Sequence, residues 1–268
     1  MIKTRNYTFI LTAFLLVFIS CEIKKKGPFT FVQLCDTQLG MGGYEHDVLC
    51  LKQAVKQINN LNPDFAVICG DLVNHASDSS YSDFKKIIKG LNVPCYLASG
   101  NHDVGNVPSK SSLKYYRETV GRDFFTFQNK GYNFVITNTQ LWKVNVPNES
   151  ENHHNWFKKT LDSLGDKQKS IFVIGHYPMY INTPDEEEKY FNLPIEYRKE
   201  ILKLFTRNKV KAYLSGHKHE LVINDYKSIQ MVSGETTSKN FDKRPMGFRL
   251  WEVSKDTIRH NFVPLENK

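Results

Sequence analysis

The sequence lacks the cysteine pairs of zinc ribbons, the basic patterns of nucleic-acid-binding proteins and the linkers of multidomain chains. It contains five cysteines among 268 residues and no CxxC pair, which excludes a zinc ribbon. It has no Arg-rich helix and no repeated basic and aromatic pattern, so its net charge of +8 does not predict nucleic acid as a partner. After Lys26 it has no linker, repeat or low-complexity segment, which favours a single domain.

What the sequence does contain is the composition of a globular protein. It is 40% hydrophobic, 13% aromatic and 24% charged, which excludes a disordered, collagenous or multi-span membrane chain. A domain of this length can bury a core large enough for an enzyme. Cys35, Cys69 and Cys95 fall in or at the end of apolar runs, where we expect buried thiols and no disulfide framework.

The amino-terminal segment differs from the rest of the chain. Lys3 and Arg5 precede an apolar run at residues 9–19, which stops at Ser20-Cys21. The run is shorter than the roughly 20 residues that a membrane-spanning helix needs. A basic start, a short apolar run and a small residue at its end are typical of a secretory signal peptide. Because Cys21 follows Ser20 directly, the segment resembles a bacterial lipoprotein signal, in which the cysteine is acylated and becomes the new amino terminus.

This resemblance implies an exported protein, lipid-anchored to the cell envelope as a periplasmic or outer-membrane lipoprotein. We therefore divide the chain into a signal peptide at residues 1–20, a tether at 21–28 and a globular domain at 29–268. An uncleaved anchor helix is the alternative interpretation. In either case we expect the body of the protein outside the cytoplasm and held at a membrane.

From Phe29 onward, short apolar runs alternate with amphipathic segments of helical length. The predicted strands cover residues 29–35, 65–69, 95–99, 171–174 and 212–214, and the predicted helices cover 47–61, 81–91, 111–120, 156–164 and 195–206. Asn129-Lys130-Gly131 is the turn of a predicted hairpin. The tail from residue 218 to 263 is nearly all strand-like, with turns at 225–227 and 254–256. This alternation predicts an α/β fold in which two mixed sheets lie face to face under helical layers.

Several of these strands end in polar residues of the types that bind metal ions. The clusters are Cys35-Asp36-Thr37-Gln38, Gly70-Asp71, Gly100-Asn101-His102-Asp103, Gly175-His176 and Gly216-His217-Lys218-His219. Since the carboxyl ends of strands in α/β sheets form the ligand crevice, the five clusters can converge there. Carboxylates, amides and imidazoles together suit two borderline divalent cations such as Mn, Fe or Zn.

In this order, the five clusters resemble the motif blocks of the calcineurin-like metallophosphoesterases. The resemblance covers the chain from Phe29 to about Val263. It implies a four-layer α-β-β-α sandwich with a dinuclear metal site at the strand ends. It also implies direct hydrolysis of a phosphoester by a hydroxide that bridges the two ions, without a covalent phosphoenzyme.

Carried over position by position, the resemblance assigns a ligand set to each ion. The first ion takes Asp36, Gln38, Asp71 and His219, and the second takes Asp71, Asn101, His176 and His217. Asp71 would therefore be the bridging carboxylate. His102 would stabilise or protonate the leaving oxygen, and Asp103 would fix the tautomer of His102.

Gln38 stands where most members of the family have histidine. An amide oxygen is a weaker ligand than imidazole for these metals, so the first ion should bind less tightly. Gln38 and the segment Tyr190-Phe191-Asn192-Leu193 also resemble the branch that contains an animal Ser/Thr protein phosphatase. Asn74, His75 and the 190–192 segment are candidates for lining the pocket. The remaining histidines have no motif partner, and we expect them on the surface or behind the ligands: His46, His153, His154 and His260.

The function that this reasoning favours is that of a monomeric phosphomonoesterase whose substrate is a phosphorylated small molecule or a phosphoprotein. One alternative is a phosphodiesterase acting on nucleotides or lipid headgroups, because the five blocks do not distinguish ester types. A second alternative is a lipoprotein that binds metal or phosphate without turnover. Gln38 is its only support, and the presence of His102 speaks against it.

Overall fold

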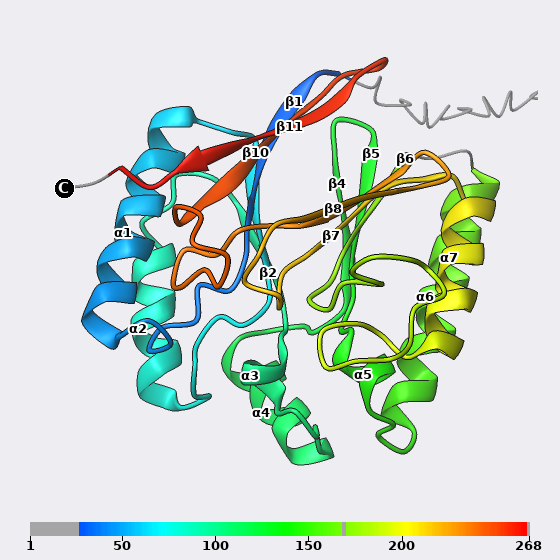
Figure 1. Ribbon diagram of the computed structural model, residues 1–268, viewed down its shortest axis with the longest axis horizontal. Coiled ribbons are helices and arrows are strands. Elements are labelled where there is room, and N and C mark those ends of the chain that lie inside the picture. The colour runs from blue at the N-terminus through cyan, green and yellow to red at the C-terminus, as the bar shows by residue number, and fades with distance from the viewer. Residues whose placement is uncertain (1–26, 168–169, 267–268) are drawn as a thin grey trace, which may run out of the picture.

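The computed structural model describes residues 27–167 and 170–266, which form four layers, α-β-β-α (Figure 1). The predicted signal peptide and the residues of the tether before 27 lie outside the described residues. Two sheets face one another, with α1 and α2 on one outer side and α6 and α7 on the other (Figure 1). The predicted fold class is confirmed.

The first sheet has five strands in the order β11-β10-β1-β2-β3. The strands are β1 (Phe29–Leu34), β2 (Phe65–Cys69), β3 (Cys95–Ala98), β10 (Gly247–Val253) and β11 (Ile258–Pro264). β1, β2 and β3 run parallel, whereas β10 pairs antiparallel with both β1 and β11. Three neighbouring strands therefore end at the same edge of this sheet.

The second sheet has six strands in the order β4-β5-β6-β7-β9-β8. The strands are β4 (Phe125–Asn129), β5 (Tyr132–Ile136), β6 (Ser170–Ile174), β7 (Val210–Ser215), β8 (Val222–Tyr226) and β9 (Ile229–Ser233). β5, β6, β7 and β9 are parallel, and β4 and β8 close the two sides as antiparallel edge strands. This sheet is also mixed, as the sequence predicts.

Seven helices connect the strands in the described part of the chain. They are α1 (Tyr44–Leu61), α2 (Asp78–Ile88), α3 (Asn101–Val104), α4 (Lys110–Thr119), α5 (Gln140–Lys143), α6 (Glu149–Asp166) and α7 (Ile195–Arg207). Local chemistry fixes several of their ends: α2 begins where the Ser77 side chain accepts a hydrogen bond from Ser80 N, and α1 ends at Asn62, whose φ of 48° is left-handed.

Three apolar clusters hold the layers together. The first packs α1, α2 and α4 on the outer face of the first sheet, and the second packs α6 and α7 on the outer face of the second sheet. The third fills the space between the sheets and is rich in aromatic rings. There the Phe31 and Phe65 rings stack with centroids 5.0 Å apart, and Phe134 meets Phe65 edge-on at 4.9 Å. Stacked and edge-on rings of this kind fix the distance and register between two sheets more tightly than aliphatic contacts would.

The structure corrects the sequence prediction in the tail and in the sixth helix. Residues 234–246 form a loop and not a strand, and the β8–β9 turn lies at Lys227-Ser228, both with positive φ, and not at 225–227. The predicted hairpin turn at residues 129–131 is confirmed between β4 and β5. α6 starts seven residues earlier than predicted, because its first two turns are largely polar and carry little apolar periodicity.

Among the described residues, no helix combines the length and the apolar content that crossing a membrane requires.

One histidine of α6 lies in the interior. His153 is fully buried beside the Trp142 ring, and its Nε2 lies 2.8 Å from Thr137 Oγ1. Burial, together with the nearby His154 and Arg117, lowers the pKa of His153 to about 3. His153 is therefore neutral in the folded protein at any ordinary pH.

We expect this histidine to make the protein less stable as the pH falls. An unfolded histidine titrates near pH 6.5, so between pH 6.5 and 3 the unfolded chain binds a proton that the folded chain does not. At pH 5 this difference removes about 2 kcal/mol of the free energy of unfolding relative to pH 7. His153→Gln should flatten that dependence, as measured by urea unfolding at both pH values. His75→Gln, at an exposed histidine, is the matched control, and an equal slope in the His153 variant and the wild type would contradict the assignment.

Candidate metal centre

The seven predicted ligands come together at the carboxyl ends of the strands. Asp36 and Gln38 follow β1, Asp71 follows β2, Asn101 follows β3, His176 follows β6, and His217 and His219 follow β7. Each of the seven is at most 4% exposed. Because the first three strands belong to one sheet and the last two to the other, the centre lies where the two sheets meet.

Two groups of three side chains share one carboxylate. Asp71, His176 and His217 form one group, and Asp36, Asp71 and His219 form the other. Within each group, one ligand atom per residue lies within 4.8 Å of the others. Asp71 belongs to both groups, which is the position of a bridging carboxylate.

Hydrogen bonds to backbone carbonyls fix how two of the histidines face the centre. His176 Nδ1 lies 2.8 Å from the Cys69 carbonyl, and His219 Nδ1 lies 2.7 Å from the Lys239 carbonyl. A carbonyl only accepts, so each Nδ1 carries the hydrogen and each Nε2 is directed to the ligand position. His217 is held the other way round, with Nε2 3.3 Å from the Tyr190 carbonyl, which leaves Nδ1 as its ligand atom.

The two amide ligands are also oriented by their neighbours. The Asn101 Nδ2 group donates to Asn106 Oδ1 at 3.1 Å, which turns Asn101 Oδ1 to within 3.0 Å of His176 Nε2. The Gln38 Nε2 group donates to Asn74 Oδ1 at 3.4 Å. Gln38 Oε1 is buried and has no hydrogen-bond partner among the described residues. A buried carbonyl oxygen without a donor is costly, and a cation would satisfy it.

The backbone at the centre is strained. Five of the seven predicted ligands have left-handed φ values, with Asp36 at 46°, Gln38 at 34°, Asp71 at 51°, His217 at 68° and His219 at 55°. Residues other than glycine adopt this conformation at a cost, and such residues are concentrated at functional sites. The chain therefore accepts strain in order to turn these side chains inward.

Glycine permits the close approach that this geometry needs. A Cβ atom at Gly100 would lie 2.1 Å from Asp71 Oδ1, and one at Gly70, whose φ is +82°, would lie 2.7 Å from His176 Nδ1. Neither position can accept a side chain without displacing a ligand, which explains why glycine stands before the polar residue in these clusters.

The electrostatics of the centre follow from burial and from close opposite charges. Burial disfavours the ionised form of Asp71, but the imidazoles around it together outweigh burial and keep the pKa of Asp71 below its usual range. His176 contributes most among them, with Nε2 3.3 Å from Asp71 Oδ2. The same contact overcomes the effect of burial on His176 and raises its pKa to about 9. Burial raises the pKa of Asp36 and lowers that of His217, which is neutral as a ligand must be.

These observations show that the residues present fit two cations. Two buried carboxylates and three imidazoles place their ligand atoms in two close groups that share Asp71. The amide oxygen of Asn101 lies beside His176 Nε2, and that of Gln38 is buried without a hydrogen-bond partner among the described residues. Without a cation, His176 Nε2 must carry a proton to face the oxygens of Asp71 and Asn101. With a cation bound, Asp71, Asn101 and His176 would be its ligands, and His176 would be neutral.

His102 and Asp103 lie beside this centre in different roles. The backbone N–H of His102 donates to Asp71 Oδ1 at 2.9 Å, and His102 Nδ1 lies 2.8 Å from the Asn74 carbonyl. The carbonyl of Asn74, and not the carboxylate of Asp103, is thus the group that sets the tautomer of His102. Asp103 instead accepts hydrogen bonds from Gly100 N at 2.8 Å and Leu72 N at 3.1 Å.

Asp103 therefore acts on the backbone of the centre. Burial and the nearby Asp71 carboxylate raise its pKa to about 7. By binding the amide groups that follow β2 and β3, it joins the loops that carry Asp71 and Asn101. The expected tautomer role for Asp103 is wrong because His102 Nδ1 faces the Asn74 carbonyl and not the Asp103 carboxylate. Motif spacing does not reveal this detail of loop geometry.

The structure places Asn74 at the centre, through its carbonyl and its amide, while His75 is exposed. Sequence reasoning missed Phe241, whose ring stacks on His219 with centroids 4.7 Å apart and planes inclined by 10°. It lies in the loop that was expected to be a strand, and no motif marks it. Thr236, which donates to the Asp36 carbonyl at 2.6 Å, was missed for the same reason.

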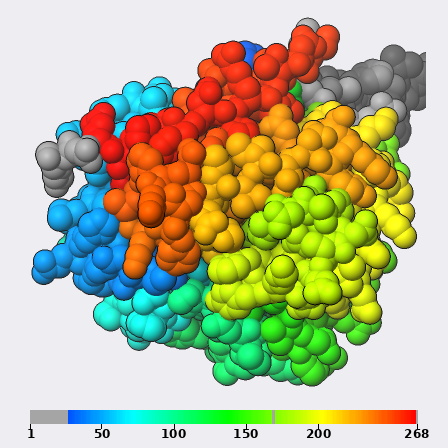
Figure 2. Space-filling view, in the orientation of Figure 1, coloured from blue at the N-terminus to red at the C-terminus, as the bar shows by residue number. Residues whose placement is uncertain are grey.

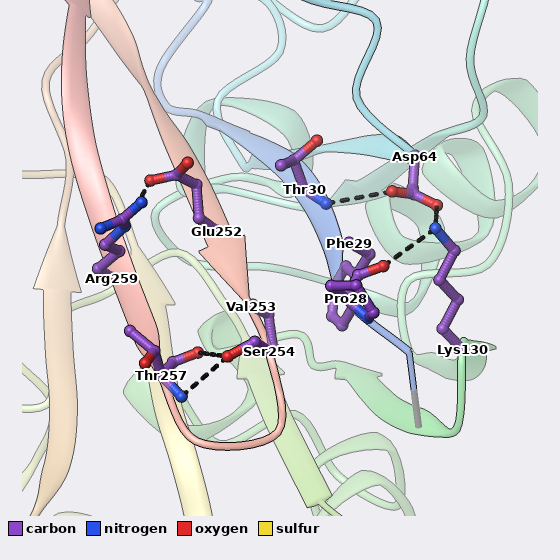
Figure 3. Close-up of a pocket in the computed structure, with 10 residues that line it drawn as sticks. All are labelled: Pro28, Phe29, Thr30, Asp64, Lys130, Glu252, Val253, Ser254, Thr257 and Arg259. Atoms are coloured by element: carbon purple, nitrogen blue, oxygen red, sulfur yellow. Dashed lines mark hydrogen bonds and ion pairs between the residues drawn. The ribbon is translucent and has the colours of Figure 1, made fainter. Parts of the chain in front are cut away.

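A separate pocket of about 480 Å³ lies at the opposite ends of the strands (Figure 3). It is lined by residues that begin β1 and β11, by Asp64 before β2 and by Lys130 in the β4–β5 turn. Its charged groups are paired, with Lys130 Nζ 2.7 Å from Asp64 and Arg259 Nε 2.7 Å from Glu252. It contains none of the predicted site residues, and nothing connects it with their chemistry.

Comparison with known proteins points to one family. A family model described as calcineurin-like phosphoesterase matches residues 29–221. The protein named serine/threonine-protein phosphatase CPPED1 in Mus musculus is 31% identical over 270 residues, covering 91% of this chain and 86% of its own. The protein of that name in Danio rerio is 32% identical over 265 residues, covering 90% and 86%. A solved dimetal phosphatase from Danio rerio shares the fold with a TM-score of 0.66 at 16% identity, covering 87% of this chain and 95% of its own.

We expect wild-type protein to bind two transition-metal ions per chain and Asp71→Asn to lose both, because one carboxylate belongs to both ligand groups. Elemental analysis of protein dialysed against each metal measures the content directly. Asp64→Asn, at the opposite end of the strands, is the matched control and should keep both ions. Two ions retained by the Asp71 variant would remove this residue from the bridging position.

Proposed function

Because the chain is a member of the calcineurin-like phosphoesterase family, we propose that this phosphoester hydrolase acts on phosphate monoesters, including those on proteins. The observation that carries the proposal is the buried centre in which two ligand groups share Asp71. The likeness to phosphatases named for serine and threonine over about nine tenths of the chain supports the choice of phosphoproteins.

The family depends on two metal ions, and we propose Mn, Fe or Zn for this protein. The mixture of imidazole, carboxylate and amide ligands is the type that these borderline cations prefer. When bound, the two ions would neutralise charge on the phosphoryl group and make a water molecule acidic enough to attack it. All seven candidate ligands come from one chain, so the centre needs no residue of a second subunit, and we propose a monomeric enzyme.

His102 is the residue that we propose to protonate the leaving oxygen. It is only partly buried, in contrast to the ligands, and its backbone N–H is hydrogen-bonded to Asp71. Because the Asn74 carbonyl accepts from Nδ1, Nε2 is the nitrogen that can give up or take a proton. Asp71 therefore fixes the backbone of this residue and Asn74 fixes its ring.

The decisive experiment compares hydrolysis of an aryl phosphomonoester, an aryl phosphodiester and a phosphopeptide by the protein loaded with Mn, Fe, Zn or Mg. We expect the monoester and the phosphopeptide to be hydrolysed faster than the diester. His102→Gln should keep both metal ions but lose about 10² to 10⁴-fold in kcat, with the greater loss for a poor leaving group. Faster hydrolysis of the diester would establish the phosphodiesterase alternative, and no turnover with two ions bound would indicate a binding protein.

We also propose that the protein is exported and anchored to the cell envelope by a lipid on Cys21. The pattern of residues 1–21 supports this proposal. Phe29 begins β1 at the end of the sheet opposite to the metal centre. An anchor only eight positions earlier would place that end toward the membrane and the metal centre away from it.

Cys21→Ser should therefore abolish lipid attachment. We expect wild-type protein, produced in a bacterium that processes lipoproteins, to incorporate labelled palmitate and to sediment with membranes, and the variant to do neither. Cys50→Ser is the control that leaves Cys21 in place. Equal labelling of wild type and the Cys21 variant would contradict the anchor.

A further inference from the structure

Three aromatic side chains border the metal centre, and we call Tyr190, Phe191 and Phe241 the aromatic rim. The rings of Tyr190 and Phe191 lie with their centroids 4.9 and 5.4 Å from that of His217. The Phe241 ring stacks on His219 at 4.7 Å. The rim therefore touches one ligand histidine of each metal group.

Two of the three rim side chains are exposed although they lie beside a buried centre, whereas Phe191 is half-buried. Tyr190 is 52% exposed and Phe241 is 43% exposed, which is unusual for large aromatic side chains. The segments that carry them, at residues 181–193 and 236–246, appear in yellow-green and orange on the face of the molecule shown in Figure 2. Rings held against a site with a face open to solvent have a surface available for a ligand.

Hydrogen bonds to its backbone fix the conformation of the segment that carries Tyr190 and Phe191. The Glu186 carboxylate accepts hydrogen bonds from three backbone N–H groups, those of Ile181, Asn182 and Thr183. The guanidinium of Arg198, which is fully buried, donates to three backbone carbonyls, those of Pro184, Glu186 and Leu193. Lys143 Nζ donates to two further carbonyls of the segment, at 2.7 and 2.9 Å. A loop tied in this way presents its rings before any ligand arrives, which lowers the entropic cost of binding.

Lys218, the basic side chain beside the aromatic rim, already has an aromatic and an acidic partner. Lys218 Nζ lies 4.7 Å from the centre of the Phe191 ring and 2.8 Å from the Glu220 carboxylate. Lys218 lies over the Phe191 ring and His219 covers one face of Phe241, so the exposed parts of Tyr190 and Phe241 are the aromatic surface left for the part of a substrate that extends from the phosphate. Ring faces of this kind attract flat apolar groups more than small polar ones.

We infer that the aromatic rim binds the leaving group of the substrate and that the site, unlike the relatives named for serine and threonine, prefers phosphomonoesters of aromatic alcohols, such as phosphotyrosyl side chains, to those of small aliphatic alcohols. The inference rests on the proposed function. It assigns to Tyr190 and Phe241 the role of specificity-determining residues, and to Arg198 that of a positioning residue.

The test separates aromatic contact from leaving-group chemistry. Phenyl phosphate and 2-naphthyl phosphate have leaving groups of similar basicity but different aromatic area, so their ratio of kcat/KM reports contact with the ring. In Tyr190→Leu and Phe241→Leu we expect this preference for the naphthyl ester to fall about 2- to 10-fold, mainly through KM, with two metal ions retained. Tyr190→Phe keeps the ring and should keep the preference.

Two results would overturn the inference while leaving the proposed function intact. One is an unchanged naphthyl-to-phenyl ratio in both leucine variants. The other is an equal loss on both esters together with lost metal, which would mean that the rings serve only to hold His217 and His219. Wild-type protein that hydrolyses neither ester would instead overturn the proposed function. A wild-type preference for a phosphotyrosine peptide over the matched phosphoserine peptide, reduced in Tyr190→Leu, would support the inference with a protein substrate.

Discussion

The contact between Asp71 and His176 is the interaction on which the candidate site depends. Asp71 follows a strand of the first sheet and His176 follows a strand of the second, and their charged atoms lie 3.3 Å apart without solvent. A carboxylate and an imidazole in such a place stabilise each other's charged forms, as the opposite shifts in their pKa values show. Each half of the centre is therefore incomplete until the two sheets have packed.

The packing that brings these halves together is largely aromatic, and hydrogen bonds cross it as well. Beneath the centre, the rings of Phe31, Phe65 and Phe134 interlock between the sheets. Gln33 crosses the same interface, donating from Nε2 to the carbonyls of Ser215 and Val232 at 3.1 Å each. The apolar rings fix the spacing of the sheets. The Gln33 amide fixes their register, because it is buried and needs these carbonyls as hydrogen-bond acceptors.

The sequence predicted the parts of this arrangement that depend on local pattern. Apolar runs located the strands that carry the ligands, and the polar clusters after them were expected to converge because the carboxyl ends of parallel strands share one edge. The choice of the seven ligands within these clusters came from the resemblance to the calcineurin-like metallophosphoesterases. The sequence could not reveal contacts that form only when loops distant along the chain come together. Asn74 sets the tautomer of His102 and Phe241 covers His219, and neither arrangement has a signature in spacing or periodicity. The loop at residues 234–246 was wrongly included in a strand-like tail, although Gly234, Asn240, Asp242 and Pro245 are residues typical of turns and loops.

The strained backbone explains why such a centre needs so large a scaffold. Left-handed φ values at five ligands cost of the order of 1 kcal/mol or more each, a sum comparable with the roughly 5 to 15 kcal/mol by which a whole domain is stable. Short flexible loops would relax and turn the ligands outward. Here the loops are tied at both ends to buried strands and to one another, through Asp103 on one side and through Asp36, which accepts from His217 N, on the other. The strain is thus sustained by the same cross-sheet contacts that assemble the ligands, so binding a cation and holding the sheets together stabilise one and the same conformation.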